Sequence, residues 1–265
     1  MESIELNDYL CKENVWARRL LGLETFTKVR DLKQVEGEYN IDKYGTLLKY
    51  KLKTIEEYKV KEFELGGALQ DQETVFSLKD RLFKSKLSLA RTIYYQIIKK
   101  KIEQYRSENI CELGCGYGYN LSYLNGDVYG GEYAENAVTL AVQLGMDVYR
   151  FNYYESKDYS FIKPNSTLFT VHSIEQIPDA HCIIDNLSVQ KDKINYVVNF
   201  EPSLIPERSS LLGLFRNKYI QLNDYNRNLF SILQSRDDIE VIEYEQDIVG
   251  INPLNSANLI VWRFK

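Results

Sequence analysis

Three glycines lie within five consecutive positions of a segment that could hold a ligand with its backbone. Residues 111–120 read CELGCGYGYN and include Gly114, Gly116 and Gly118. Glycine lets the backbone approach a ligand closely, and the free amides at the start of a following helix can donate hydrogen bonds to it. A dinucleotide-binding turn needs its third glycine one position later, where Tyr119 stands, so pyrophosphate binding is disfavoured. The alternative without a ligand is a plain tight turn.

A carboxylate follows at a distance that suits a ribose. Glu132 ends an apolar segment and lies about 20 residues after Glu112. At the end of the second strand of a nucleotide-binding sheet, such a carboxylate can accept hydrogen bonds from both ribose hydroxyls. A solvated surface acid would fit the sequence as well. The position of Glu132 relative to the glycines favours the ribose interpretation.

Two further residues at strand ends could handle a proton or orient a substrate. His172 closes the apolar segment 166–172, and the pKa of a free imidazole, about 6.5, makes it a useful general base. Glu201 follows the apolar segment 195–200 and precedes a proline. The alternatives are a histidine bonded to backbone or touching only a cofactor, and a surface acid without a function.

These residues require a sheet whose strand ends meet at one edge. Short apolar segments alternate with helical ones from residue 109 onward, which is typical of a parallel sheet covered on both faces. We predict strands at 109–113, 127–132, 147–151, 166–172 and 195–200, and helices beginning near Tyr119, Glu135 and Ala180. Residues 238–248 and 258–264 form a candidate antiparallel pair. The fold class is therefore α/β, with a doubly wound sheet.

The chain before this sheet is less regular. The spacing of apolar residues predicts an amphipathic helix near residues 7–26 and a long helix over 77–105 with room for one break. Residues 44–67 fit either a strand pair or a short helix.

Composition excludes several classes of function. The chain has 265 residues, a net charge of -5 and no apolar run long enough to cross a membrane, so we expect neither nucleic acid nor a membrane as partner. The beginning of the sequence lacks a secretory pattern, and we expect a cytoplasmic protein. Four scattered cysteines and two histidines have no zinc-ligand spacing, so no metal site is expected. No pattern indicates an oligomeric state.

The segments ELGCGYG and GGEY resemble motif I and the acidic second-strand motif of the class I S-adenosylmethionine (SAM)-dependent methyltransferases. The resemblance covers about residues 107–200. It implies a mostly parallel, seven-stranded Rossmann-like sheet with SAM over the glycine turn and S-adenosylhomocysteine (SAH) as the product. Residues 1–76 would form an N-terminal, largely helical cap that recognises the substrate, and residues 77–265 the SAM-binding domain.

The resemblance also assigns individual residues to the cofactor. Near its methionine part it places Glu112, which would meet the amino group, and Gly114, Cys115, Gly116 and Gly118. Glu132 would hold the ribose, and Tyr133, Asn152 and Tyr153 would surround the adenine, with His172 as a further contact. Asn152 stands where the family usually has an acid. Gln176 stands where the family usually has a histidine.

Methyl transfer is a direct displacement, so alignment supplies much of its acceleration, and a base assists when the acceptor must lose a proton. His172 and Glu201 are the candidates for catalysis. We expect transfer to an O or N atom of a small molecule, such as a metabolite or an activated sugar precursor in bacterial cell-surface or specialised biosynthesis. The alternatives are a nicotinamide-dependent oxidoreductase, which the glycine spacing disfavours, and a noncatalytic partner subunit, which the residues Asn152 and Gln176 would suit.

Overall fold

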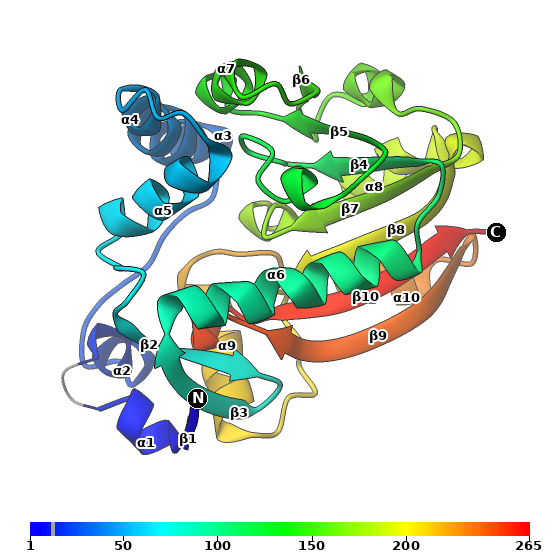
Figure 1. Ribbon diagram of the computed structural model, residues 1–265. Coiled ribbons are helices and arrows are strands. Elements are labelled where there is room, and N and C mark those ends of the chain that lie inside the picture. Colours follow the sequence, from blue (N-terminus) through cyan, green and yellow to red (C-terminus); the bar gives the residue numbers. More distant parts are fainter. Residues whose placement is uncertain (12–13) are drawn as a thin grey trace.

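Seven strands form a central sheet in which one strand runs against its neighbours. They are β4 (Asn109–Leu113), β5 (Asp127–Glu132), β6 (Val148–Arg150), β7 (Ser166–Val171), β8 (Ile194–Glu201), β9 (Ile239–Val249) and β10 (Ala257–Phe264). In the computed structural model, which describes residues 1–11 and 14–265, their order is β6-β5-β4-β7-β8-β10-β9 (Figure 1). Strand β10 is antiparallel to β8 and β9, whereas the pairs from β6 to β8 are parallel. The predicted doubly wound, mostly parallel sheet is confirmed.

The strand ends agree with the prediction to within one residue. Their burial explains this agreement, because strands covered on both faces read as short apolar runs. In β4 every residue is buried, and Ile110 packs into the core on one face while Cys111 and Leu113 pack into the core on the other. Because side chains alternate along a strand, Glu112 shares the face of Ile110 and ends at the edge where the glycine turn begins.

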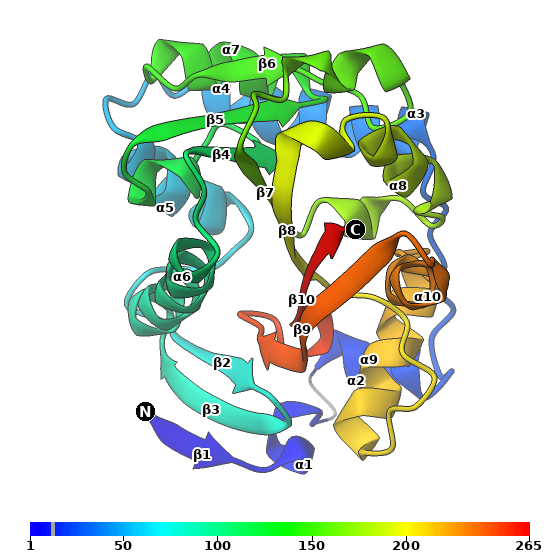
Figure 2. The same ribbon diagram turned by 90° about the vertical axis from the view of Figure 1, so that its right-hand side faces the viewer.

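Helices cover both faces of the sheet. α6 (Leu87–Gln104) and α7 (Glu135–Gln143) pack on the face of Ile110, and α8 (His181–Ser188) and α10 (Leu229–Ser235) pack on the face of Cys111. Figure 2 shows α6 on one side of the sheet and α8 and α10 on the other. The predicted helix starts near Glu135 and Ala180 are confirmed.

The helix predicted to begin near Tyr119 is wrong. Only a single 3-10 turn, Leu121–Tyr123, separates the glycine segment from β5. The left-handed backbone of Gly118, with φ +84°, interrupts any regular helix there. The segment between Gly118 and Asp127 is too short to form a helix that would cover the sheet.

The prediction of a helix across residues 77–86 is also wrong, because these residues belong to a hairpin. β2 (Glu73–Leu78) and β3 (Arg81–Lys86) pair around a turn at Lys79, whose φ is +54°, and β1 (Glu2–Ile4) extends the sheet in the order β1-β3-β2. The apolar residues of this segment satisfy a helical period and also the strand period of two. The boundary proposed at residue 76 falls inside β2.

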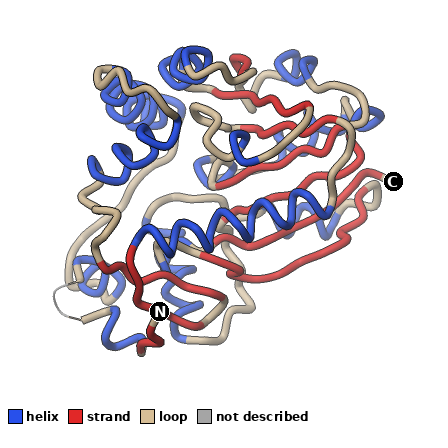
Figure 3. Tube along the Cα trace, in the orientation of Figure 1, coloured by secondary structure: helices blue, strands red, loops and turns tan. Residues whose placement is uncertain are grey.

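The remaining N-terminal elements form a mostly helical cap, which we define as residues 1–65. They are α1 (Leu6–Tyr9), α2 (Val15–Leu20), α3 (Leu32–Val35), a π-helix (Glu36–Tyr44), α4 (Gly45–Leu48) and α5 (Ile55–Leu65). Figure 3, in the orientation of Figure 1, shows α4 and α5 beside the central sheet and α1 and α2 near the small sheet of β1, β2 and β3. α9 (Leu211–Leu222) packs with α2 and the hairpin through Leu20, Leu82 and Ile220. Among the described residues, no helix is both long and apolar enough to span a membrane.

Candidate active site

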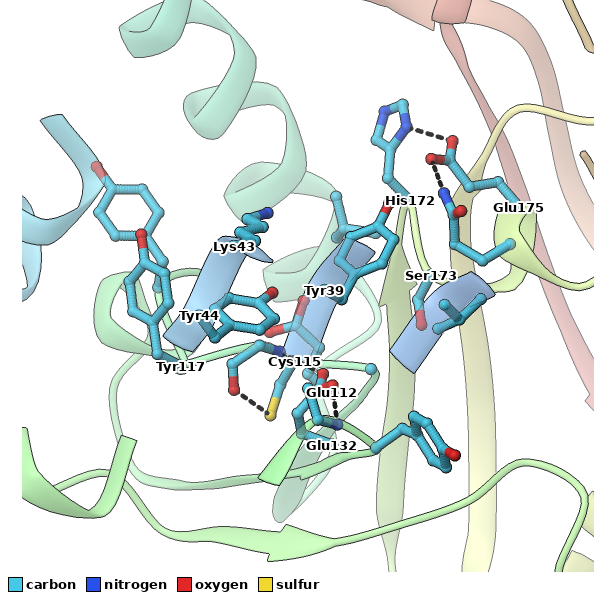
Figure 4. A pocket seen from close by; sticks show the side chains of 18 of the residues that line it. Tyr39, Lys43, Tyr44, Glu112, Cys115, Tyr117, Glu132, His172, Ser173 and Glu175 are labelled. Carbon is cyan, nitrogen blue, oxygen red and sulfur yellow. Dashed lines mark hydrogen bonds and ion pairs between the residues drawn. The ribbon is translucent and has the colours of Figure 1, made fainter. Parts of the chain in front are cut away.

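A cavity of about 510 Å³ lies where the carboxyl ends of β4, β5 and β7 face the cap. Figure 4 shows Tyr39, Lys43 and Tyr44 of the cap together with Glu112 and Glu132 at the strand ends. The lining contains most of the predicted site residues, namely Glu112, Gly114, Cys115, Gly116, Glu132, Tyr133, Asn152, Tyr153 and His172. Gly118 and Glu201 do not line it. The cavity is therefore built by three separate parts of the chain, namely residues 30–63, 94–177 and 251–255.

The glycine turn has a backbone that only glycine adopts readily. Gly114, Gly116 and Gly118 have φ values of +74°, +56° and +84°. The backbone amides of Gly114 and Cys115 both donate to the carbonyl oxygen of Gly131, at 2.7 and 3.1 Å, which holds the turn against β5. A Cβ added to Gly116 would lie 2.7 Å from the Tyr44 hydroxyl, so the cap closely approaches this turn.

Replacing Gly114 by alanine is expected to destabilise the protein more than replacing Gly22. Both glycines have a positive φ, which an alanine adopts at a cost of about 1–2 kcal/mol. A Cβ at Gly22 meets nothing within 4 Å, whereas one at Gly114 would lie 2.5 Å from Cβ of Ser173 and force a shift. Overpacking adds about 1–3 kcal/mol. Urea unfolding of the two variants measures the difference, and equal losses would contradict the close approach.

Glu132 is held by the glycine turn. Its Oε2 accepts from the amide of Gly116 at 2.8 Å, and its Oε1 accepts from the amide of Ala134 at 2.7 Å. Burial raises the pKa of this carboxyl, although the two amide donors act in the opposite direction. The carboxylate thereby links the end of β5 to the centre of the turn. Glu132 is also part of the cavity lining.

Glu112 presents a buried oxygen without a partner. Its Oε1 accepts from the side-chain amide of Asn120 at 2.6 Å, and its Oε2 has no hydrogen-bond partner among the described residues. The side chain is almost fully buried, and this burial raises its pKa to about 8 despite the hydrogen bond from Asn120. An unpaired buried carboxylate oxygen is costly, so this position favours a cationic donor.

Replacing Glu112 by glutamine is expected to stabilise the ligand-free protein increasingly as the pH rises. The pKa of Glu112 is about 8 in the folded state and 4.5 without burial, so folding favours its protonated form. Its contribution to stability is therefore lost as the pH rises from about 4.5 through 8. Glutamine has no such loss. Urea unfolding of the wild type and the variant at pH 5 and pH 8 measures the difference in their free energies of unfolding. The same difference at both pH values would contradict the burial of the charge.

The residues predicted to surround an adenine all line the cavity, and each has partners within the protein. The Tyr133 ring stacks against Arg150, whose guanidinium carbon is 4.9 Å from the ring centre. The Asn152 side-chain oxygen accepts from the backbone amide of Tyr154 at 3.0 Å, so the NH2 group of Asn152 points away from that amide. The Tyr153 hydroxyl donates to the carbonyl oxygen of Leu113 at 2.8 Å and contacts Oγ of Ser173 at 3.0 Å.

His172 forms a pair with Glu175 directly after β7. Nδ1 of His172 lies 2.7 Å from Oε2 of Glu175, and the His172 backbone has φ +52° while its amide donates to the carbonyl of Phe200. Burial opposes the charged imidazole, but the charge and hydrogen bond of Glu175 outweigh this effect and raise the pKa of His172. The sequence interpretation did not assign Glu175 this position, although its spacing of three residues from His172 was a usable signal.

Glu201 lies beneath this loop rather than in the cavity. Its carboxylate accepts from the backbone amides of Ser173, at 3.0 Å, and Glu175, at 2.9 Å. The side chain is fully buried, and this burial raises its pKa to about 7. Strand β8 extends through Glu201, so the loop after β7 folds over the carboxylate. Its position suits support of the His172 loop instead of direct contact with an acceptor.

The cap contributes a half-buried ion cluster that sequence analysis missed. Glu62 of α5 binds Lys43 at 2.6 Å and Lys59 at 2.9 Å, and it accepts from the Tyr117 hydroxyl at 2.7 Å. Burial acts to raise the pKa of Glu62, but the two lysines outweigh it and hold the pKa well below its usual range. The cluster ties the cap to the glycine segment, and only the folded chain brings its members together.

The known proteins that resemble this chain were found by their structures and not by their sequences. No protein-family model matches the sequence, and no curated protein matches it. The magnesium protoporphyrin IX methyltransferase ChlM from Synechocystis PCC 6803, solved with SAH bound, is 10% identical and has a TM-score of 0.51, with 89% of this chain and 100% of that chain covered.

Two other solved structures match over shorter parts of the fold. OxaC, in complex with SAH and oxaline, is 11% identical with a TM-score of 0.45, covering 63% of this chain and 46% of that chain. This chain thus spans about half the length of OxaC. The plantazolicin methyltransferase BpumL, in complex with SAH, is 19% identical with a TM-score of 0.38, covering 66% and 81%. With its strand order and the match to ChlM, the chain has the Rossmann-like fold of class I SAM-dependent methyltransferases.

Proposed function

We propose that this protein transfers a methyl group from SAM to an oxygen or nitrogen atom of a small molecule. The observation that carries the proposal is the buried Oε2 of Glu112, which lacks a hydrogen-bond partner among the described residues and belongs to the cavity wall beside the glycine turn. An α-ammonium group would supply both the charge and the donors that this oxygen lacks. This acceptor in the cavity wall therefore fits the α-ammonium group at the amino-acid end of SAM.

The other predicted residues fit the remaining parts of the cofactor. Glu132 has lone pairs left for ribose hydroxyls after accepting from Gly116 and Ala134. The side-chain NH2 of Asn152 and the ring of Tyr133 would hold the adenine. When bound, SAM supplies an electrophilic methyl group on a sulfonium. The chain itself then has to align the acceptor, exclude water and remove a proton.

His172 would remove that proton. It lines the cavity, and its pairing with Glu175 through Nδ1 leaves Nε2 for the acceptor. Glu201 would hold the loop that carries both residues. The cap closes the cavity with Tyr39, Lys43 and Tyr44, which suits a small acceptor enclosed away from water. We expect this acceptor to be a metabolite, such as an activated sugar precursor in bacterial cell-surface or specialised biosynthesis.

Calorimetric titration with SAM, SAH and NAD+ tests the cofactor. Micromolar binding of SAM and SAH without binding of NAD+ is the expected result. Binding of NAD+ alone would replace the proposal by a nicotinamide-dependent oxidoreductase. Failure of SAM and SAH to bind would overturn it.

Turnover separates an enzyme from a noncatalytic subunit that only binds the cofactor. The isolated chain, incubated with SAM and a panel of small hydroxyl and amine compounds, is expected to produce SAH in amounts that depend on the acceptor. SAH formation at the same slow rate with and without every acceptor would favour the noncatalytic role.

A further inference from the structure

Glu175 accepts hydrogen bonds from three side chains around the acceptor side of the cavity. Nδ1 of His172 lies 2.7 Å and Nδ2 of Asn255 lies 3.1 Å from its Oε2, and Nε2 of Gln176 lies 2.6 Å from its Oε1. The carboxylate itself is buried, with 4% of the residue exposed. Figure 4 shows the pairing of His172 with Glu175 beside the cavity. The three partners all line the cavity, and they come from the loop after β7 and from the segment before β10.

A carboxylate only accepts hydrogen bonds, and this fixes the orientation of all three partners. His172 must carry its proton on Nδ1, so the lone pair of its Nε2 faces away from Glu175. Gln176 and Asn255 must turn their NH2 groups to Glu175, so their carbonyl oxygens also face away. Both of these oxygens, Oε1 of Gln176 and Oδ1 of Asn255, are buried and have no hydrogen-bond partner among the described residues.

We propose, on the basis of the methyl-transfer function above, that Glu175 is a positioning residue that turns these three acceptor atoms toward the substrate. The substrate class that they fit is a neutral compound whose reacting hydroxyl stands next to a second O–H or N–H donor. The reacting hydroxyl gives its proton to Nε2 of His172 while its oxygen forms a bond to the methyl carbon. The electron pair of the broken C–S bond stays on sulfur. The second donor pairs with Gln176 or Asn255.

The charges of the cavity favour a neutral substrate. Its three cationic side chains all have carboxylate partners, because Arg30 pairs with Glu38 at 2.6 Å and Lys43 and Lys59 share Glu62. The lining also holds more acidic than basic side chains, namely Asp31, Glu62, Glu112, Glu132 and Glu175 against Arg30, Lys43 and Lys59. An anionic substrate would have to compete with these carboxylates. The cavity lining also includes apolar side chains, among them Leu32, Val35, Ile177 and Ile251. A substrate without the second donor would leave both buried carbonyl oxygens unpaired instead of one, and such sites reject the poorer analogue strongly.

The proton position on His172 tests the positioning role without any knowledge of the substrate. The chain has two histidines, His172 and His181, so nitrogen-15 NMR spectra of the wild type and of His181→Gln assign both rings. In the SAH-loaded protein, at a pH where the ring is neutral, His172 is expected to carry its proton on Nδ1. Glu175→Gln should shift part of the population to the Nε2–H form. A wild-type ring protonated on Nε2 would overturn the proposal.

A matched pair of compounds tests the substrate class. Catechol carries two adjacent hydroxyl donors, and 1,2-dimethoxybenzene has the same skeleton without donors. Catechol is expected to bind the SAH-loaded protein at least tenfold more tightly, and Gln176→Met or Asn255→Leu should reduce that ratio. Equal binding, or binding of neither compound, would overturn the assignment. If SAH itself does not bind, the cofactor proposal fails instead, and the proton position on His172 can still be read in the free protein.

Discussion

Replacing Glu132 by alanine is expected to weaken binding of SAH by at least about 100-fold, which corresponds to about 2.7 kcal/mol. The carboxylate would accept from both ribose hydroxyls and it also holds the amides of Gly116 and Ala134 in place. A hydrogen bond to a charged group contributes about 1.5–3 kcal/mol, and the two amides would lose their partner in a buried site. Loss of the carboxylate therefore removes ligand contacts and loosens the glycine turn together.

Calorimetry with SAH measures this loss, and Glu132→Gln separates its two causes. Glutamine keeps the shape and one acceptor oxygen, so it should retain more of the turn than alanine does but should still bind SAH poorly. Glu135, an exposed acid at the start of α7, is the matched control, and Glu135→Ala should bind SAH as the wild type does. Circular dichroism establishes that each variant is folded. Binding by folded Glu132→Ala within threefold of the wild type would remove Glu132 from the cofactor site.

The sequence was most informative where a residue's surroundings are local or periodic. β4 and β5 were predicted with their observed bounds, because each is a short and mostly buried strand with a clear end. β4 ends just before Gly114 of the glycine turn, and β5 ends at the charged residue Glu132. The positions of Glu112 and Glu132 at one edge followed from these bounds. The placement of His172 at the cavity followed in the same way from the end of β7.

The sequence was least informative where two periods coincide or where contacts are long-range. In residues 77–86 the apolar side chains fit a helix, but Phe76 and Phe83 pack against each other across the hairpin, with ring centres 5.8 Å apart. The cap residues Lys43 and Glu62 meet Tyr117 only in the folded chain. No spacing within either segment indicates the other.

The number of fixed hydrogen-bond donors explains why three buried carboxylates at one end of the sheet suit different tasks. Glu201 is covered completely and accepts from two backbone amides of the loop above it, so it suits support. Glu112 is equally enclosed but keeps an oxygen unpaired, so it suits a cationic ligand. Glu175 uses its oxygens on three side-chain donors, so it suits orientation of a base. The same residue type thus differs in function because the number of fixed donors differs.

Replacing His172 by asparagine is expected to lower kcat by about 10²- to 10⁴-fold, the usual contribution of a general base, while affinity for SAH stays near that of the wild type. Asparagine tolerates the left-handed backbone at this position, where φ is +52°, and its NH2 group can still donate to Glu175. The variant should therefore fold and keep the loop, but it has no basic nitrogen for the acceptor. Rates with the acceptor that the wild type methylates, together with SAH calorimetry, measure the two effects.

The pH dependence of the rate distinguishes a base from a group that only shapes the loop. Glu175 and Glu201 raise the pKa of His172, whereas burial and the nearby Lys59 lower it, and the Tyr94 ring lies 6.3 Å away. Because the net shift is upward, the rate should rise with pH through a pKa above about 6.5, and Glu175→Gln should move that rise toward lower pH. His181→Asn, which changes the exposed histidine, should leave the profile unchanged. A profile that His172→Asn does not flatten would assign the proton transfer to another group.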